Sequence, residues 1–208
     1  MANLITLSRI LLLFVLIGIA YQTGTYLQFL ELPILIVIFI TDALDGFVAR
    51  KRGESSLFGA LFDIAVDRIV ENVLWVVLAD LGLVPIWVPI VFIMRGSIVD
   101  SVRAHAASQG LTPFGMMRSG LGRFLVAGRF MRIAYAVVKA MAFGWIVLFQ
   151  PVQTLFPGFW SDWGPALQGV TNGLIYAAVA FNLARGLPVV VEFVLREAQA
   201  GAGSRSGA

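Results

Sequence analysis

The residues best suited to chemistry in this chain are four aspartates in the run DALDGFVARKRGESSLFGALFDIAVD, which begins at Asp42 and ends at Asp67. Asp42 and Asp45 are three positions apart, and Asp63 and Asp67 are four apart, so each pair lies on one face of a helix. The short polar stretch 51–56 can join two such helices. We therefore predict that two carboxylates on one helix face two carboxylates on the next.

A cation must lie among four neighbouring carboxylates, because they repel one another and are costly to bury. The chain has no cysteine and a single histidine, His105, so the ligands here are all oxygen. Such ligands favour a hard divalent ion, Mg²⁺ or Mn²⁺, and four carboxylates can hold two ions. Gly46 and Gly59 leave room for a ligand to approach the backbone. The predicted metal ligands are Asp42, Asp45, Asp63 and Asp67.

The composition is that of an integral membrane protein. Of 208 residues, 59% are hydrophobic and 13% are charged, against about 25% charged in an average soluble protein, and the mean hydropathy is +0.89. The lack of cysteine excludes disulfides and thiolate chemistry. The net charge is +3 and the isoelectric point is near 9.7, but the basic residues cluster at a few helix ends. This placement indicates membrane topology rather than nucleic-acid binding.

Segments apolar enough to cross a hydrocarbon core of about 30 Å occur roughly at 4–21, 28–50, 59–82, 84–103, 130–150 and 166–190. We expect an all-α integral membrane protein with about six transmembrane helices around a polar cavity open to the cytoplasm. The single catalytic domain would cover 1–197, followed by a disordered tail at 198–208. Three connections carry no lysine or arginine: 21–31, 80–86 and 149–165. Both termini and the aspartates are therefore expected on the cytoplasmic face of the inner membrane.

Arginines outside the aspartate run are candidates for binding an anion. Arg95 and Arg103 lie eight positions apart on one predicted helix, and Arg95 falls well inside an apolar segment. An arginine at that depth is costly, so it is a functional candidate, with structural pairing to Asp100 or to one of the four aspartates as the alternative. Arginines bind phosphate well, although those beside a membrane also hold lipid headgroups. The cations that follow are Arg118, Arg123, Arg129 and Arg132.

The aspartate run fits the pattern D-x-x-D-G-x-x-A-R-x8-G-x3-D-x3-D, with all eight fixed positions filled over 26 residues. In this it resembles the CDP-alcohol phosphotransferase (phosphatidyltransferase) family of membrane enzymes. The resemblance implies that the hydroxyl of an acceptor alcohol attacks the β-phosphoryl group of a CDP-linked lipid and releases CMP. It also implies a homodimer, with Asp67 as the general base. The residues implied to bind the nucleotide and its diphosphate are Asp45, Gly46, Ala49, Arg50 and Gly59.

Two further stretches resemble phosphatidylglycerophosphate synthases, namely NLITLSRILL at 3–12 and LVPIWVPIVFIMRGSIVDSVR at 83–103. This implies CDP-diacylglycerol as the donor and glycerol 3-phosphate as the acceptor. The run from Asp67 to Ile69 is more like synthases that use inositol phosphate, so that acceptor is the alternative. A small cation transporter with the acids along its ion path is the hypothesis from another class. The residues expected to hold the acceptor phosphate are Arg95, Arg103, Arg118, Arg129 and Arg132.

Overall fold

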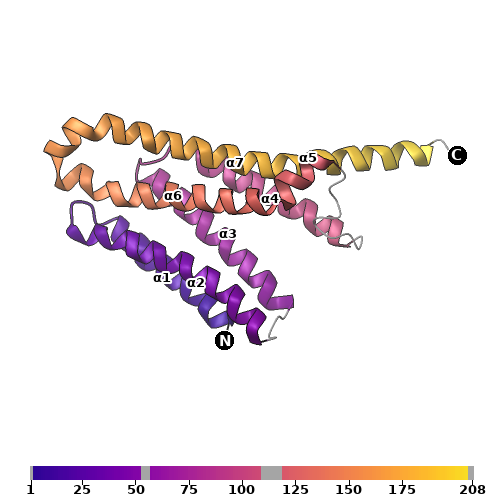
Figure 1. Ribbon diagram of the computed structural model, residues 1–208, viewed down its shortest axis with the longest axis horizontal. Helices are drawn as coiled ribbons and strands as arrows, with labels where there is room; N and C mark the ends of the chain where they lie inside the picture. Colours follow the sequence, from indigo (N-terminus) through magenta and orange to yellow (C-terminus); the bar gives the residue numbers. More distant parts are fainter. Residues whose placement is uncertain (1, 53–56, 109–118, 206–208) are drawn as a thin grey trace. The chain divides into compact units, whose positions relative to one another are not determined.

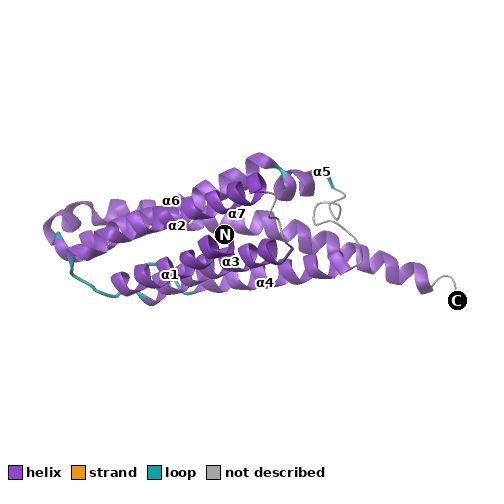
Figure 2. Ribbon diagram, turned by 90° about the horizontal axis from the view of Figure 1, so that it is seen from below, coloured by secondary structure: helices purple, strands orange, loops and turns teal. Residues whose placement is uncertain are grey.

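The structure is a computed structural model that describes residues 2–52, 57–108 and 119–205, and over these residues its regular elements are all helical (Figure 2). A 3-10 helix, η1 (Tyr26–Leu30), leads into the second long helix, and two short helical pieces, α5 (Gly120–Gly122) and η2 (Arg123–Ala127), precede the fifth. The long helices are α1 (Ala2–Ala20), α2 (Glu31–Arg52), α3 (Leu57–Asp80), α4 (Trp87–Ser108), α6 (Arg129–Leu155) and α7 (Pro157–Arg205) (Figure 1).

Each predicted apolar segment overlaps one long helix, but the ends differ. The helices α6 and α7 extend beyond the predicted segments at both ends, whereas the predicted segments at 28–50 and 84–103 begin before α2 and α4. The predicted connection 149–165 is mostly helical, because α6 ends at Leu155 and α7 begins at Pro157. Proline suits a first helical position, where an N–H group would have no partner within the helix. By length and composition, two stretches among the described residues can cross a membrane, Arg129–Leu155 and Pro157–Arg196, and Thr6–Ala20 is a shorter apolar helix. The count of six spans stays a prediction.

The chain divides into two compact units, and each is described by itself. Unit 1 comprises Met1–Pro89 and Met141–Gly173, and unit 2 comprises Ile90–Ala140 and Leu174–Ala208. The boundaries cut through α4, α6 and α7, so each of these helices contributes to both units. The proposed catalytic domain at 1–197 and the disordered tail remain predictions.

Unit 1 is organised around α1, which packs against both α2 and α3 (Figure 1). Its buried side chains include Leu13 and Leu16 on α1 and Leu35 on α2. Trp75 on α3 is fully buried, with its ring centroid 4.4 Å from that of Phe143 on α6. These contacts hold the polar ends of α1, α2 and α3 in fixed register, which positions the site described below.

A glycine ends α3. Gly82 has a φ of 74°, a conformation that side chains with a Cβ rarely adopt. Its backbone N–H donates to the carbonyl of Ala79 at 3.0 Å, and the N–H of Leu83 donates to the carbonyl of Leu78 at 2.9 Å. These bonds satisfy carbonyls that the end of a helix otherwise leaves without partners.

Unit 2 has an apolar core of its own. Val99 and Val102 on α4 are buried together with Val126 of η2 and Val189 of α7. At the edge of this core the rings of His105 and Phe193 meet edge to face, with centroids 5.6 Å apart. The core joins α4 to α7 within the unit and so fixes the setting of the arginines on these helices.

Candidate active site

Three of the four predicted aspartates come together in unit 1. Asp42 lies on α2, and Asp63 and Asp67 lie one turn apart on α3. One carboxylate oxygen from each lies within 4.8 Å of one from each of the others. The side chains are 44%, 37% and 50% exposed, so solutes can reach the group. Asp42 of the first half of the aspartate run therefore faces Asp63 and Asp67 of the second half, while the predicted place of Asp45 beside it stays a prediction.

The three carboxylates share one cation from the chain itself, Arg9 on α1. Its Nη1 donates to Asp42 and, at 2.7 Å, to Asp67, and its Nη2 donates to Asp63. The Arg9 side chain is only 1% exposed. A planar guanidinium presents several N–H groups in a fixed fork, so it can bind three carboxylates at once. Arg9 thereby ties α1 to α2 and α3 at the level of the site.

Arg9 was not among the site residues predicted from the sequence. One signal was available, because Arg9 is the only charged residue before Glu31, in a segment that is otherwise apolar. A charged side chain inside such a segment has a function or a partner as a rule. The partner could not be named from spacing, since Arg9 is 33 residues from Asp42 and 58 from Asp67.

The donor set fits a hard divalent ion. Oxygens bound to one Mg²⁺ lie about 2.1 Å from it, hence no more than about 4.2 Å from one another. The carboxylate oxygens of Asp42, Asp63 and Asp67 lie within 4.8 Å, so small side-chain rotations bring all three within range. The three aspartate side chains are partly exposed and offer only oxygen atoms as ligands, which such an ion prefers. Arg9 contacts one oxygen of each of these carboxylates, so it competes with an ion for them.

Several predicted site residues cannot be placed in this geometry. The side chains of Asp45, Gly46, Ala49 and Arg50 lie outside the described part of the structure, although their backbone belongs to α2. Gly59 lies on α3, one turn before Asp63. The predicted nucleotide-binding group and the fourth metal ligand therefore remain predictions.

The predicted acceptor-site arginines lie in unit 2, apart from Arg118, which is outside the described residues. Arg95 on α4 is partly buried and packs on Gly186 of α7, where an added Cβ would lie 2.3 Å from its Nε. Arg103 is also partly buried on α4, whereas Arg129 and Arg132 are exposed on α6. The structure thus relates Arg95 to α7, but it gives no arrangement of these arginines around the aspartates.

A second group of cations in unit 2 surrounds Tyr135 on α6. Lys139 Nζ lies 5.3 Å from the centre of its ring, and the guanidinium carbon of Arg185 lies 5.2 Å from it. The Tyr135 hydroxyl donates to Asn182 at 3.4 Å. A cation near an aromatic face gains roughly 0.5–1 kcal/mol or more when desolvated. Arg185 directly precedes Gly186 in the sequence, and the side chain of Arg95 packs on Gly186 from α4. Both cations are therefore held at the same turn of α7.

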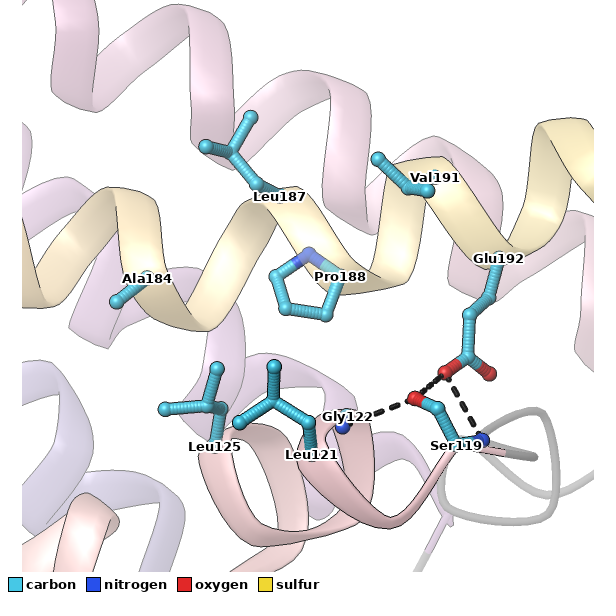
Figure 3. Close-up of a pocket in the computed structure, with 9 residues that line it drawn as sticks. All are labelled: Ser119, Leu121, Gly122, Leu125, Ala184, Leu187, Pro188, Val191 and Glu192. Carbon is cyan, nitrogen blue, oxygen red and sulfur yellow. Dashed lines mark hydrogen bonds between the residues drawn. The ribbon is translucent and has the colours of Figure 1, made fainter.

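An apolar cavity of about 390 Å³ lies elsewhere in unit 2, between the 119–125 segment and α7 (Figure 3). Its polar end is Ser119, whose hydroxyl and backbone N–H both donate to Glu192, the latter at 3.2 Å. Ser119 Oγ also accepts a bond from the N–H of Gly122 at 3.0 Å, as an N-cap residue does. The other lining residues are Leu121, Leu125, Ala184, Leu187, Pro188 and Val191. The cavity lacks the groups that phosphoryl transfer requires.

Comparison with known proteins gives several relatives of similar sequence. The chain is 39% identical to CDP-diacylglycerol–glycerol-3-phosphate 3-phosphatidyltransferase of Mycoplasma genitalium over 67 residues, 32% of this chain and 28% of that one. It is 29% identical to a probable phosphatidylglycerophosphate synthase of Mycobacterium tuberculosis over 116 residues, 54% and 56% of the two chains. It is 31% identical to CDP-diacylglycerol–glycerol-3-phosphate 3-phosphatidyltransferase of Escherichia coli over 78 residues, 38% and 43%.

The matched stretches span between 28% and 56% of the length of these three relatives. The family model for CDP-alcohol phosphatidyltransferase matches more of the chain, residues 1–184. That range includes the aspartates, Arg9 and most of the arginines of unit 2. Together with the carboxylate group on α2 and α3, this match shows that the chain belongs to the CDP-alcohol phosphatidyltransferase family, whose members are membrane enzymes.

Proposed function

We propose that this protein transfers a phosphatidyl group from CDP-diacylglycerol to glycerol 3-phosphate and releases CMP. The observation that carries the proposal is the group Asp42, Asp63 and Asp67, which lies within the range of the family model. Relatives named for this reaction with glycerol 3-phosphate support the choice of acceptor. The reaction joins the acceptor oxygen to the β-phosphorus and breaks the bond from that phosphorus to the CMP oxygen.

The carboxylates have separate tasks in this proposal. Asp42, Asp45 and Asp63 hold one or two Mg²⁺ or Mn²⁺ ions, which when bound neutralise the diphosphate and the departing CMP. Asp67 has the most exposed side chain of the three described aspartates, at 50%, so it can reach a soluble acceptor. It takes the proton of the acceptor hydroxyl, where its position contributes more than its basicity.

Arg9 is a positioning residue in this scheme. Its guanidinium bonds to all three carboxylates and it is buried, so it keeps α2 and α3 at the spacing that an ion needs. Arg50 pairs with the diphosphate, and Gly46, Ala49 and Gly59 make room for the nucleotide. The catalytic residue proper is Asp67.

The acceptor phosphate is held by arginines in this proposal. Arg95 is the main candidate, because Gly186 lets its side chain lie directly on the backbone of α7. Arg103, Arg118, Arg129 and Arg132 add positive charge, which suits an anionic acceptor and steers it by long-range attraction. The protein would act as a homodimer in the inner membrane, with both termini and the site facing the cytoplasm.

The test is CMP release by purified protein in detergent with CDP-diacylglycerol, Mg²⁺ and a panel of acceptors. Glycerol 3-phosphate should support turnover, and EDTA should abolish it. If inositol phosphate is the only acceptor that supports turnover, it replaces glycerol 3-phosphate in the proposal, and the phosphatidyl transfer itself stands. If no acceptor yields CMP while proteoliposomes show cation flux, the transporter hypothesis replaces the enzyme.

A further inference from the structure

A second polar group lies in unit 1 where α1 ends, and we call it the Ala20 cluster after the carbonyl around which it forms. Its side chains are Glu31, Gln28 and Gln150, which are 0%, 1% and 6% exposed. The Ala20 carbonyl accepts from Gln28 Nε2 at 3.4 Å and from Gln150 Nε2 at 2.9 Å. The last carbonyls of a helix have no partner within it, so the two glutamines satisfy this one.

Glu31 is joined to the cluster through the backbone. It is the first residue of α2, and its N–H donates to the carbonyl of Gln28 at the end of η1. Residues three apart in a 3-10 or α-helical turn lie on the same side, so the two side chains are neighbours. The cover comes from α6 and from the residue that follows it. Leu32 lies 3.5 Å from a Cβ built at Gly144 on α6, and the rings of Phe29 and Phe156 are 6.5 Å apart.

Four side-chain oxygens of the Ala20 cluster have no hydrogen-bond donor among the described residues. They are both carboxylate oxygens of Glu31 and the amide oxygens of Gln28 and Gln150. The orientation of each amide follows from the Ala20 carbonyl, which needs an N–H group in front of it. Turning the amides around would only create another carbonyl without a donor. Leaving such buried oxygens unpaired is costly.

The described helices of unit 1 that surround this group bring no positive side chain to it. Within unit 1, the sequence has no lysine, arginine or histidine at 10–49, 69–89 or 141–173. Those ranges include every residue of η1 and the unit 1 parts of α6 and α7, together with the second half of α1. Arg9 lies eleven residues before Ala20 and bonds to the aspartates instead.

We propose that the Ala20 cluster binds a hard monovalent cation, with Na⁺ as the ion of this class to test. The carboxylate of Glu31 and the amide oxygens of Gln28 and Gln150 would be its ligands, because oxygen ligands suit hard cations. One carboxylate balances one positive charge, whereas a divalent ion would leave an excess charge buried. The site is separate from the aspartates and would stabilise the junction of α1, η1, α2 and α6.

The experiment follows thermal unfolding of the full chain in detergent while NaCl is exchanged for choline chloride at constant ionic strength. Na⁺ should raise the unfolding midpoint saturably, by about 5 °C for a bound ion that favours the folded state. Glu31→Gln should abolish this Na⁺ response. The matched control, Asp162→Asn, removes an exposed acid from the same unit and should keep the response.

A second variant guards against failure of Glu31→Gln to fold. Gln150→Leu keeps the carboxylate but removes one amide oxygen, so the half-maximal Na⁺ concentration should rise about tenfold. An unchanged half-maximal concentration in Gln150→Leu would overturn the proposal. So would equal midpoints in NaCl and choline chloride for the wild type, which would mean that Glu31 is held as the neutral acid.

Discussion

Near Arg9, three carboxylates of unit 1 share one guanidinium, whereas near Ala20 the buried carboxylate of Glu31 has no hydrogen-bond donor among the described residues. The first group is partly exposed and its cation comes from the chain. The second is closed and receives none from the sequence around it. From this difference we infer that the carboxylates around Arg9 can exchange the guanidinium for metal and substrate. The Ala20 cluster would instead keep the cation that balances the charge of Glu31.

The largest expected effect comes from Asp67→Asn, in the carboxylate group around Arg9. The amide keeps the size of the side chain but cannot take a proton, so CMP release should fall by about 10³-fold or more. Binding of CDP-diacylglycerol should survive, because Asp42, Asp45 and Asp63 remain. The measurement pairs CMP release with binding of labelled CDP-lipid. Full activity in this variant would remove Asp67 from the role of base.

Removing Arg9, which the three carboxylates share, should lower the stability of the fold. Arg9→Met leaves three carboxylates facing one another without the guanidinium, and we expect a loss of about 2–3 kcal/mol in unfolding free energy, discounted because the acids are partly exposed. Mg²⁺ should then raise the unfolding midpoint more in Arg9→Met than in the wild type, since it takes over the compensation.

Arg123→Met is the control for Arg9→Met, because Arg123 is exposed and belongs to unit 2. It removes the same charge and adds the same methionine, but it should change the midpoint by little. Equal destabilisation by the two variants would mean that Arg9 contributes only general charge. The guanidinium of Arg9 would then have no specific part in holding the three carboxylates.

The sequence predicted the carboxylates around Arg9 better than the Ala20 cluster. The spacing of Asp63 and Asp67 places them on one helix face, and the polar stretch 51–56 brings Asp42 opposite them, so local rules sufficed. Arg9 and Gln150 were missed because their partners are far along the chain, 33 and 130 residues away. Such pairings depend on which helices pack together, and hydrophobic periodicity does not specify that.

The helices themselves were predictable from apolar composition, but their ends were not. Hydropathy marked 166–190, whereas α7 begins at Pro157, because a helix can continue through polar residues that a membrane core would exclude. The packing of Arg95 on Gly186 was also beyond the sequence, since it joins α4 to α7.

A third prediction extends the comparison to a partly buried cation of α4, Arg95. Gly186→Ala adds a methyl group 2.3 Å from Arg95 Nε, so the arginine must move although no charge is lost. The KM for glycerol 3-phosphate should rise about tenfold, with little change in the KM for CDP-diacylglycerol. Gly173→Ala on the same helix is the control, because nothing lies within 4 Å of its added Cβ. Equal effects on both KM values would make Arg95 structural.

The smallest effect concerns Tyr21, which follows Ala20 and donates a hydrogen bond to the exposed Asp80. That bond raises the pKa of the Tyr21 phenol above its ordinary value of 10.0. Since the bond needs the phenolic proton, its stabilisation is fully present below the ordinary pKa and is lost as the pH rises through the raised one. Tyr21→Phe should therefore lower the unfolding midpoint by about one or two degrees near neutral pH, and the gap should close in strong alkali. The Na⁺ response of the Ala20 cluster should persist in Tyr21→Phe, because the phenol oxygen is not one of the four unpaired oxygens of that cluster.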